Sequence, residues 1–313
     1  MGIRIGVDGG GSKTEIIALD HTGRVLCCLR TPASNYHVVG IEQAVQNIIE
    51  GICHALQEGT LEGIGITVAG IDTLEDWKIM AGSLKQGLMA LALEANIHIQ
   101  EVPVILENDV FGALMSVRGE FSGNVLAVGT GVVALGVNPE GEVIRVGGWG
   151  HRFGDQGSGY DIGRKALAAM VASFDGYGPK SILEDKITEH LELAQVQYIS
   201  DWLHQKKPTT KEVAALAPVV VEAARKGDFV SLRILEESGR DLGLLTKALL
   251  RKTKGLELGL VGGITHIWDM LGPSFMATVQ EEFPDLQILK PNYSPSVGAA
   301  LLSRIHQVRH IEL

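Results

Sequence analysis

Three short apolar runs followed by a helical pattern open this sequence, and the same arrangement begins again near the middle of the chain. The first copy has runs at 3–8, 15–20 and 24–30, and the glycine-rich turn GGGS follows the first of them. Short strands joined by tight turns predict an antiparallel meander. Residues 41–56 then carry apolar side chains at helical spacing, and further strands and helices alternate after them.

The second copy has apolar runs at 124–128, 132–137 and 142–146, and the turn after its first run is GTGV. Helical patterns cover much of 157–250, and a last helix is expected at 296–308. The repeat lies in the order of elements and the position of the glycine turns, because the two halves share little sequence otherwise.

We therefore predict an α/β protein with two domains, 1–118 and 119–293, each with a βββαβαβα core. The C-terminal helix, at about 294–313, is expected to pack back on the first domain. A length of 313 residues suits two domains of ordinary size. Ligands of such proteins bind at strand C-terminal ends and at domain boundaries, so we expect the active site in the cleft between the domains.

Charge and composition restrict the partners. The chain has 27 Lys and Arg residues against 37 Asp and Glu residues, with a formal net charge of −10 and no basic run. Such a chain is a poor candidate for binding nucleic acid or a membrane surface. It has no apolar run long enough for a transmembrane helix and starts directly with the strand-like MGIRIGV. With Cys27, Cys28 and Cys53 in no metal-binding spacing, we expect a cytoplasmic protein.

The two glycine turns are candidate phosphate sites. Glycines let backbone N–H groups converge on an anion because no Cβ atoms stand in the way, although a tight hairpin turn also uses glycine. The P-loop is excluded, because Ser12 precedes Lys13 and a strand follows. Residues 129–134 match the dinucleotide fingerprint, but they too continue as a strand and offer no helix N-terminus for a pyrophosphate. A phosphate turn inside a β-hairpin, present once in each half, remains.

Two carboxylates accompany these turns. Asp8 precedes the first turn, and a carboxylate beside phosphates is repulsive unless a cation intervenes, which suggests Mg²⁺ held partly through water. The alternative is an Asp that caps the turn. Asp109 follows the apolar strand 102–106 and begins a helix. It would serve as the N-cap, as the general base for a hydroxyl that attacks a phosphoryl group, or as both.

The segment GGWGHRFGDQGSGYDIG is the densest polar, glycine-rich stretch after the opening one. Such a loop is costly to order without a ligand or partner. Ser158 and Asp161 have the spacing of a capping box at a helix start. Asp155 could hydrogen-bond sugar hydroxyls. His151 is expected to be structural, because no Ser or Cys nucleophile pattern accompanies it.

Several segments together resemble one known family. In chain order they are IGVDGGGSKTEIIALD, SNYH, ENDVFGA, AVGTGVVALG, GGWGHRFGDQGSGYDIG, LVGGI and SPSVGAALL. This series is similar to the N-acetylglucosamine kinase group of the BadF/BadG/BcrA/BcrD ATPase family, in the actin-like sugar-kinase superfamily, over nearly the whole chain. The GGWGHxxGDxGS pattern is quite specific, whereas DGGGSKT and GTG occur more widely. The resemblance implies two RNase-H-like domains that close on ATP, Mg²⁺ and an amino sugar.

The resemblance also implies a role for individual residues. The expected ATP-binding residues are Gly9, Gly10, Gly11, Ser12, Lys13, Thr14, Gly129, Thr130, Gly131, Gly262 and Gly263. The expected contacts to the sugar are Asn35, Asp109, Gly148, Trp149 and Asp155. Asp109 would be the base for a sugar hydroxyl, expected at C6, and Asp8 and Asp109 would hold the metal. We also expect a homodimer.

Three departures from the family pattern leave the sugar open. Val132, Val133 and Val146 stand where mammalian-type members have polar residues and a cysteine, so glucosamine, N-acetylglucosamine, N-acetylmuramate and an anhydro-sugar all stay candidates. An activator ATPase of a partner reductase is a second class. It would hold an iron–sulfur cluster through converging cysteines, and here all three lie in the first quarter of the chain. A non-catalytic sugar sensor is a third class, and the presence of both Asp8 and Asp109 argues against it.

Overall fold

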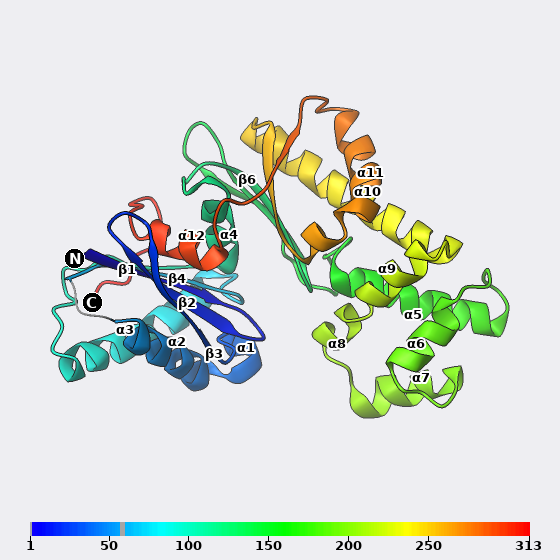
Figure 1. The fold of residues 1–313 in the computed structure, drawn as a ribbon, viewed down its shortest axis with the longest axis horizontal. Helices are drawn as coiled ribbons and strands as arrows, with labels where there is room; N and C mark the ends of the chain where they lie inside the picture. Colours follow the sequence, from blue (N-terminus) through cyan, green and yellow to red (C-terminus); the bar gives the residue numbers. More distant parts are fainter. Residues whose placement is uncertain (1, 57–59) are drawn as a thin grey trace. The chain divides into compact units, whose positions relative to one another are not determined.

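The structure is a computed structural model that describes residues 2–56 and 60–313. The chain divides into two compact units (Figure 1). Unit 1 comprises Met1–Ser122 together with Lys290–Leu313, and unit 2 comprises Gly123–Leu289. Each unit is built around its own five-stranded mixed sheet with helices packed against it.

The sheet of unit 1 has the strand order β3-β2-β1-β4-β5. Its strands are β1 (Gly2–Gly9), β2 (Thr14–Asp20), β3 (Val25–Thr31), β4 (Thr60–Val68) and β5 (Val104–Glu107). The first three form the predicted antiparallel meander, while β4 runs parallel to β1 and β5 parallel to β4. The C-terminal ends of β1, β4 and β5 therefore meet at one edge of the sheet.

Helices cover both faces of this sheet (Figure 1). The helices α2 (Ile41–Ala55) and α3 (Leu74–Glu94) pack on alternate apolar residues of β1 and β4, because side chains two apart along a strand share a face. On the other face lie α4 (Asp109–Arg118) and α12 (Pro295–Leu302). At Gly65 a Cβ atom would stand 1.7 Å from the Ala299 carbonyl oxygen, so α12 approaches the sheet only because a glycine is there.

The last helix is shorter than the sequence pattern predicts. It ends at Leu302, and the rest of the chain continues as an irregular segment. Part of that segment pairs with β5, where Ile105 and His310 form an antiparallel bridge. Strand β5 is the last strand of its sheet, and its unpaired backbone groups are satisfied by an extended chain and not by a helix.

The sheet of unit 2 has the order β10-β9-β6-β7-β8. Its strands are β6 (Gly123–Val128), β7 (Val132–Val137), β8 (Val143–Gly147), β9 (Glu257–Gly262) and β10 (Gln287–Leu289). Strands β6, β7 and β8 form an antiparallel meander, and β9 and β10 follow as parallel strands. This is the topology of unit 1, with β6 in the place of β1, and it confirms the predicted repeat of elements.

Unit 2 carries most of the helices. They are α5 (Gly159–Asp175), α6 (Leu183–His190), α7 (Ile199–Asp201), α8 (Thr210–Ala214), α9 (Ala217–Arg225), α10 (Phe229–Thr253) and α11 (Trp268–Gln280). A π-helical turn, η2 (Trp202–Lys206), follows α7, and a 3₁₀ turn, η3 (Gly263–His266), follows β9. The long α10 contributes Leu242, Leu249 and Leu250 to the core that it shares with α11 and the sheet.

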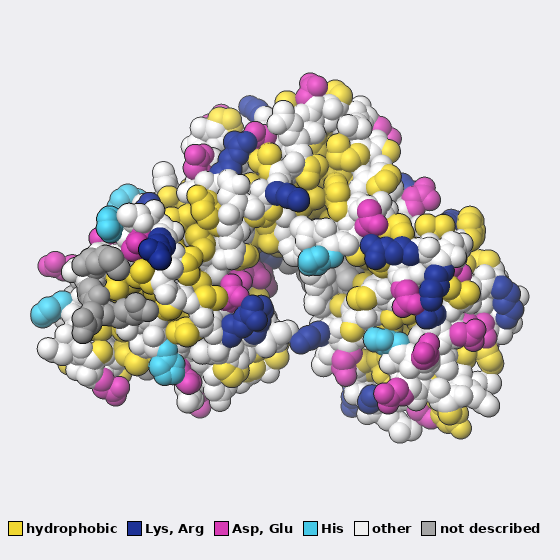
Figure 2. All heavy atoms as spheres, in the orientation of Figure 1, with side chains coloured by type: hydrophobic (Ala, Val, Ile, Leu, Met, Phe, Trp, Pro, Cys, Tyr) yellow, Lys and Arg dark blue, Asp and Glu magenta, His cyan; other side chains and the backbone are white. Residues whose placement is uncertain are grey.

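Charged side chains of both signs are interspersed on the surface. On the face that Figure 2 shows, Lys and Arg side chains stand among Asp and Glu side chains in both units. Among the described residues, no helix combines the length and the apolar character that a membrane span requires.

Candidate active site

The first glycine turn joins β1 to β2 and is tied to two neighbouring segments. Within the turn, the Gly10 N–H donates to the Lys13 carbonyl oxygen at 2.9 Å. The Gly10 carbonyl oxygen in turn accepts from the N–H groups of Ser34 (3.1 Å) and Asn35 (3.3 Å). The Gly9 carbonyl oxygen accepts from the N–H of Ala69, the residue that follows β4, at 2.8 Å. The turn is therefore held rigidly while Gly11 and Ser12 are exposed at its tip.

The three glycines of this turn are required for different reasons. None of them has a left-handed φ, so backbone conformation alone does not demand glycine. At Gly9 a Cβ atom would stand 2.2 Å from Ser34 Oγ, and at Gly10 one would stand 3.2 Å from the Lys13 carbonyl oxygen. At Gly11 a Cβ atom would have Val38 Cγ2 as its nearest neighbour, 4.0 Å away. Neither packing nor conformation accounts for Gly11, and bare backbone at an exposed turn is what an approaching anion needs.

Two polar side chains of the turn lie in different environments. Thr14 is fully buried, and its hydroxyl lies 2.8 Å from both the Pro32 carbonyl oxygen and Ser34 Oγ, so it braces the turn from below. Lys13 is exposed, and its Nζ lies 3.9 Å from a Glu15 carboxylate oxygen.

Asp8 and Asp109 form an acidic pair at the C-terminal edge of the unit 1 sheet. Burial first, and then the negative charges of Asp109 and Glu15, raise the pKa of Asp8 to about 7 against the opposing charge of Lys13. Each carboxylate makes the ionised form of the other less favourable, and a divalent cation between them would remove this repulsion. The two oxygen donors therefore suit a hard divalent cation.

The local chemistry fits Mg²⁺ in particular. Within residues 2–56 and 60–313, no group of three or more His, Cys, Asp or Glu side chains is placed to hold a metal ion. Asp8 and Asp109 would supply one or two carboxylates, and water and phosphate oxygens would fill the other positions around the ion. Mg²⁺ is usually bound in this way in phosphate-transfer sites.

Asp109 is the first residue of α4, but it is not the cap. The side-chain oxygen of Asn108 accepts the Val110 N–H at 3.1 Å and so caps the helix. The Asn108 amide also donates to the Ile71 carbonyl oxygen at 3.3 Å. The structure therefore excludes the alternative role of Asp109 as the cap of α4, because its neighbour Asn108 has the extended backbone that an N-cap needs. Asp109 is left with its carboxylate near Asp8.

Asn35 stands beside the first turn at the start of the short helix α1 (Tyr36–Val39). Its side-chain oxygen accepts the His37 N–H at 3.0 Å, and His37 Nε2 lies 3.1 Å from the Gly70 carbonyl oxygen. The Tyr36 hydroxyl donates to Asp76 on α3. Burial together with this bond raises the pKa of Tyr36 to about 12. Burial acts to raise the pKa of Asp76 as well, but its hydrogen bonds outweigh burial and lower it to about 2. The pair ties α1 to α3 and so holds Asn35 in place.

The second glycine turn joins β6 to β7 in unit 2 and repeats the design of the first. The Gly129 N–H donates to the Gly131 carbonyl oxygen at 2.9 Å. The carbonyl oxygens of Gly129 and Thr130 accept from the N–H groups of Gly159 (2.9 Å) and Tyr160 (3.1 Å) at the start of α5. A Cβ atom at Gly129 would meet nothing within 4 Å, and the residue has no left-handed φ. Like the tip of the first turn, this glycine leaves bare backbone that the fold does not require.

Asp155 lies against this second turn. It is 8% exposed, and its carboxylate accepts the Val132 N–H at 3.1 Å. A Cβ atom at Gly131 would stand 2.9 Å from the same carboxylate. The backbone of Asp155 has a left-handed φ of 63°, which is uncommon for a residue other than glycine and is often found at functional sites.

The loop before Asp155 begins with Gly148 and Trp149. The Gly148 N–H donates to the Val132 carbonyl oxygen at 3.0 Å, and its own carbonyl oxygen accepts from Arg145 at 2.6 Å. Trp149 is 80% exposed and belongs to no part of the core. An indole ring left at the surface by a firmly held backbone suits a ligand contact better than a structural role.

Gly262 and Gly263 complete the C-terminal edge of the unit 2 sheet. Gly262 ends β9 and pairs with Val128, the residue before the second turn. Its φ is 93°, and a Cβ atom there would stand 2.3 Å from the Val128 carbonyl oxygen. Unit 2 thus brings Gly262 and Gly263 close to the second glycine turn. In unit 1, the first glycine turn, Asn35, Asp8 and Asp109 lie at one edge of the sheet. The sequence analysis assigned no role to Gly70, whose carbonyl oxygen contacts His37, or to Asn108, which caps α4. A glycine just after a strand and an Asn just before a helix were the signals that could have indicated them.

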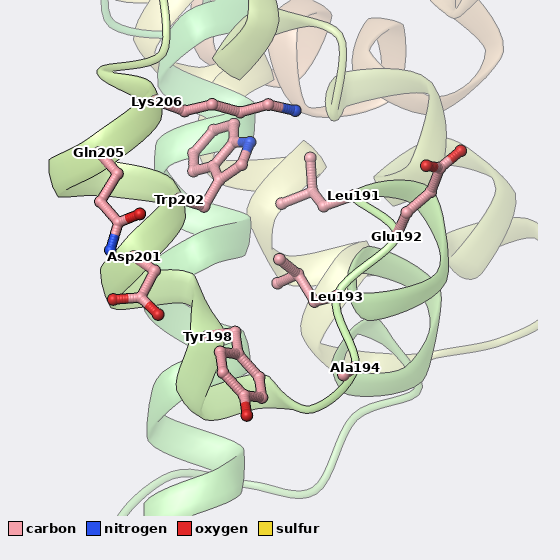
Figure 3. A pocket seen from close by; sticks show the side chains of 9 residues that line it. All are labelled: Leu191, Glu192, Leu193, Ala194, Tyr198, Asp201, Trp202, Gln205 and Lys206. Carbon is pink, nitrogen blue, oxygen red and sulfur yellow. The ribbon is translucent and has the colours of Figure 1, made fainter.

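A hollow of about 390 Å³ lies elsewhere in unit 2. It is lined by residues from 191–194 and 198–206, and Figure 3 shows the Trp202 ring on one side, next to the Lys206 side chain and facing Leu191. None of the predicted site residues lines it.

Comparison with known proteins gives a consistent result. The model of the BadF/BadG/BcrA/BcrD ATPase family matches residues 5–303. The chain is 33% identical to the N-acetyl-D-glucosamine kinase of Dictyostelium discoideum, and it is 33% identical to the N-acetylmuramic acid/N-acetylglucosamine kinase of Clostridium acetobutylicum. In both cases 96% of this chain and 97% of the relative are covered.

Solved structures share the fold. A structure from Chromobacterium violaceum, described provisionally as an N-acetylglucosamine kinase, is 24% identical and superposes with a TM-score of 0.74, covering 96% of this chain and 98% of that one. A ROK family glucokinase from Streptomyces griseus, solved with glucose and AMPPNP, has a TM-score of 0.59 at 19% identity, with 96% and 99% of the two chains covered.

Proposed function

Because this chain belongs to the BadF/BadG/BcrA/BcrD ATPase family, we propose that it is an ATP-dependent kinase that phosphorylates an amino sugar. One structural observation carries the proposal: Asp8 and Asp109 converge at the edge of the sheet from which the first glycine turn projects. Phosphoryl transfer needs a phosphate-binding backbone, a cation site and a base, and unit 1 offers a candidate for each.

Asp109 is proposed to remove the proton from a sugar hydroxyl, at C6, as this oxygen attacks the terminal phosphoryl group of ATP. Backbone N–H groups of both glycine turns bind the ATP phosphates, and Gly262 and Gly263 lie near the adenosine. Asn35, Gly148, Trp149 and Asp155 contact the sugar. Mg²⁺ held by Asp8, and in part by Asp109, supplies positive charge to the phosphates.

The rigidity of the first turn supports its part in this mechanism. Its backbone is held by Ser34 and Asn35, so its N–H groups need little reorganisation when phosphate binds. Thr14 supports the turn from beneath, while the exposed Ser12 and Lys13 are free to approach phosphate oxygens.

The sugar is proposed to be N-acetylglucosamine or N-acetylmuramate, with glucosamine as the alternative. The test is ADP formation with Mg·ATP and a panel of these three sugars, an anhydro-sugar and glucose, followed by NMR of the product to locate the phosphate. Faster turnover with an amino sugar than with glucose, and phosphate at C6, are the expected results. ADP formation that no sugar stimulates would refute the proposal.

We further propose a cytoplasmic location and a homodimer. The three cysteines are free thiols, which agrees with a reducing compartment. Analytical ultracentrifugation would test the dimer.

Gly11→Ala and Gly129→Ala are each expected to weaken ATP binding by roughly 10- to 100-fold, because the added methyl group keeps a phosphate oxygen from reaching the backbone N–H and so costs about one hydrogen bond to a charged group. Each substitution would leave the fold intact, because the added Cβ atom meets no protein atom closer than 4.0 Å. Isothermal titration with a nonhydrolysable ATP analogue measures the effect.

Gly82→Ala is the matched control for these variants. It lies within α3, where the added Cβ atom also meets nothing within 4 Å, and it should stabilise the helix by about 0.5–1 kcal/mol. ATP affinity should not change. Parent-like affinity in both turn variants would exclude the turns as phosphate sites.

A further inference from the structure

Glu107, the last residue of β5, is a buried carboxylate whose partner comes from the end of the chain. It is 3% exposed, and a buried charge is costly unless it is paired and hydrogen-bonded. Arg309 provides both. Its backbone N–H donates to Glu107 Oε1 at 3.0 Å, its Nε lies 3.1 Å from each carboxylate oxygen, and its Nη2 forms a further short contact.

Arg309 is itself held in place by the sheet and by α3. The Leu106 N–H donates to the Arg309 carbonyl oxygen at 3.2 Å, and the Ile311 N–H donates to the Val104 carbonyl oxygen at 2.8 Å. The guanidinium group lies 5.5 Å from the centre of the Trp77 ring. The indole N–H of Trp77 donates to the Leu106 carbonyl oxygen at 2.7 Å. The end of β5 is thus fixed by the C-terminal segment on one side and by α3 on the other.

The two residues that follow Glu107 are Asn108, which is bonded to Ile71 and caps α4, and Asp109. We propose that Arg309 is a positioning residue for phosphoryl transfer. By pairing with Glu107, it fixes the end of β5 and therefore the direction of the Asp109 carboxylate. The inference rests on the proposed function and adds to it a residue 200 positions away in sequence, in a segment that carries none of the candidate binding residues.

Arg309→Met in the full-length chain tests the proposal. Misplacing a catalytic group by about 1 Å can reduce the rate by about 100-fold, so kcat is expected to fall by roughly 10- to 100-fold. KM for ATP should stay within about twofold of the parent value, because the glycine turns are untouched. Arg309→Lys keeps the charge but loses the planar fork and should have an intermediate kcat.

Arg4→Met is the matched control in the same unit. Arg4 pairs with Glu62 at 2.6 Å, between β1 and β4, and both residues lie towards the opposite end of the sheet from Asp109. This variant should lose Tm without losing kcat. Hydrogen exchange gives a readout that needs no substrate: amides of 108–110 should exchange faster in the Arg309 variants and at the parent rate in Arg4→Met.

A double variant keeps the test decisive if Arg309→Met leaves too little folded protein. Glu107→Gln combined with Arg309→Met removes both charges, so it buries no unpaired carboxylate, and it should fold with kcat still reduced. Parent-like kcat and parent-like exchange at 108–110 in the folded double variant would overturn the positioning role. So would an equal loss of kcat in Arg4→Met. Failure of the proposed function can be distinguished from failure of the positioning role. In the first case the parent protein would phosphorylate no sugar, and the hydrogen-exchange comparison would still test whether Arg309 fixes residues 108–110.

Discussion

Asp109→Asn is expected to reduce kcat by roughly 10²- to 10⁴-fold, the usual contribution of a general base, with little change in ATP affinity. An amide of the same size cannot accept the proton of the attacking hydroxyl. The fold should tolerate the change, because Asn108 caps α4 and Asp109 is only partly buried. A coupled ADP assay measures kcat, and titration with a nonhydrolysable analogue measures nucleotide affinity.

A matched control separates the loss of the base from a general effect on a helix start. Asp185 also lies in the first turn of a helix, α6 in unit 2, and it is exposed. Asp185→Asn should cost about 0.3–1 kcal/mol of helix-dipole interaction and leave kcat unchanged. A kcat for Asp109→Asn within about fivefold of the parent would remove Asp109 as the base, since general bases contribute far more than that.

Asp8→Asn is expected to raise the Mg²⁺ concentration for half-maximal activity by at least about tenfold and to lower kcat, because a direct or water-bridged ligand is lost. The metal-free protein should become more stable at the same time. Desolvation and the charges of Asp109 and Glu15 make the charged form of the Asp8 carboxylate unfavourable in the folded state. Loss of activity together with a gain in stability is typical of functional sites.

The gain in stability expected for Asp8→Asn should increase with pH. The pKa of Asp8 is raised from 3.8 to about 7 in the folded protein, so the folded state binds the proton more tightly than the unfolded chain does. The charged carboxylate therefore destabilises the parent progressively as the pH rises from about 4 to about 7. The difference in Tm between Asp8→Asn and the parent should grow across this window, as calorimetry without Mg²⁺ would show.

Glu15→Gln is the control for Asp8→Asn. Glu15 lies opposite Asp8 in the β1–β2 register, but its carboxylate contacts Arg30 and Ser296. Its loss removes a nearby negative charge without removing a proposed metal ligand, so the Mg²⁺ requirement should change by less than about twofold. An unchanged Mg²⁺ requirement in Asp8→Asn, or a lower Tm at pH 8, would contradict the assignment.

Local sequence patterns predicted the parts of this structure that depend on near neighbours. The strand–turn–strand order around Gly9–Gly11 and Gly129–Gly131 follows from alternation and turn chemistry, both of which act within a few residues. Asp109 could be placed at the end of β5 for the same reason. The extent of the last helix could not be predicted, because the edge of β5 competes for the residues after Leu302.

Functional roles within the turns needed the folded structure. The sequence shows three adjacent glycines, but only the packing of Ser34 against Gly9 and the open space at Gly11 separate the structural glycine from the one that a ligand would use. Likewise, Ser12 and Thr14 both carry a hydroxyl group. Only their burial shows that Thr14 supports the turn from inside, through Ser34, and that Ser12 lies at the exposed tip.

By itself, the sequence determined the repeated α/β order, the two glycine turns, the family and the residue types at the candidate site. Only the tertiary structure decided that Asp8 and Asp109 share one edge of a sheet and that Arg309 secures Glu107 across 202 positions of the chain. Hydrophobic periodicity and turn preference depend on residues close together in the chain, so the sequence alone reveals them. The pairing of the buried Glu107 with Arg309 depends on which distant backbone reaches the end of β5, and no local sequence pattern shows that.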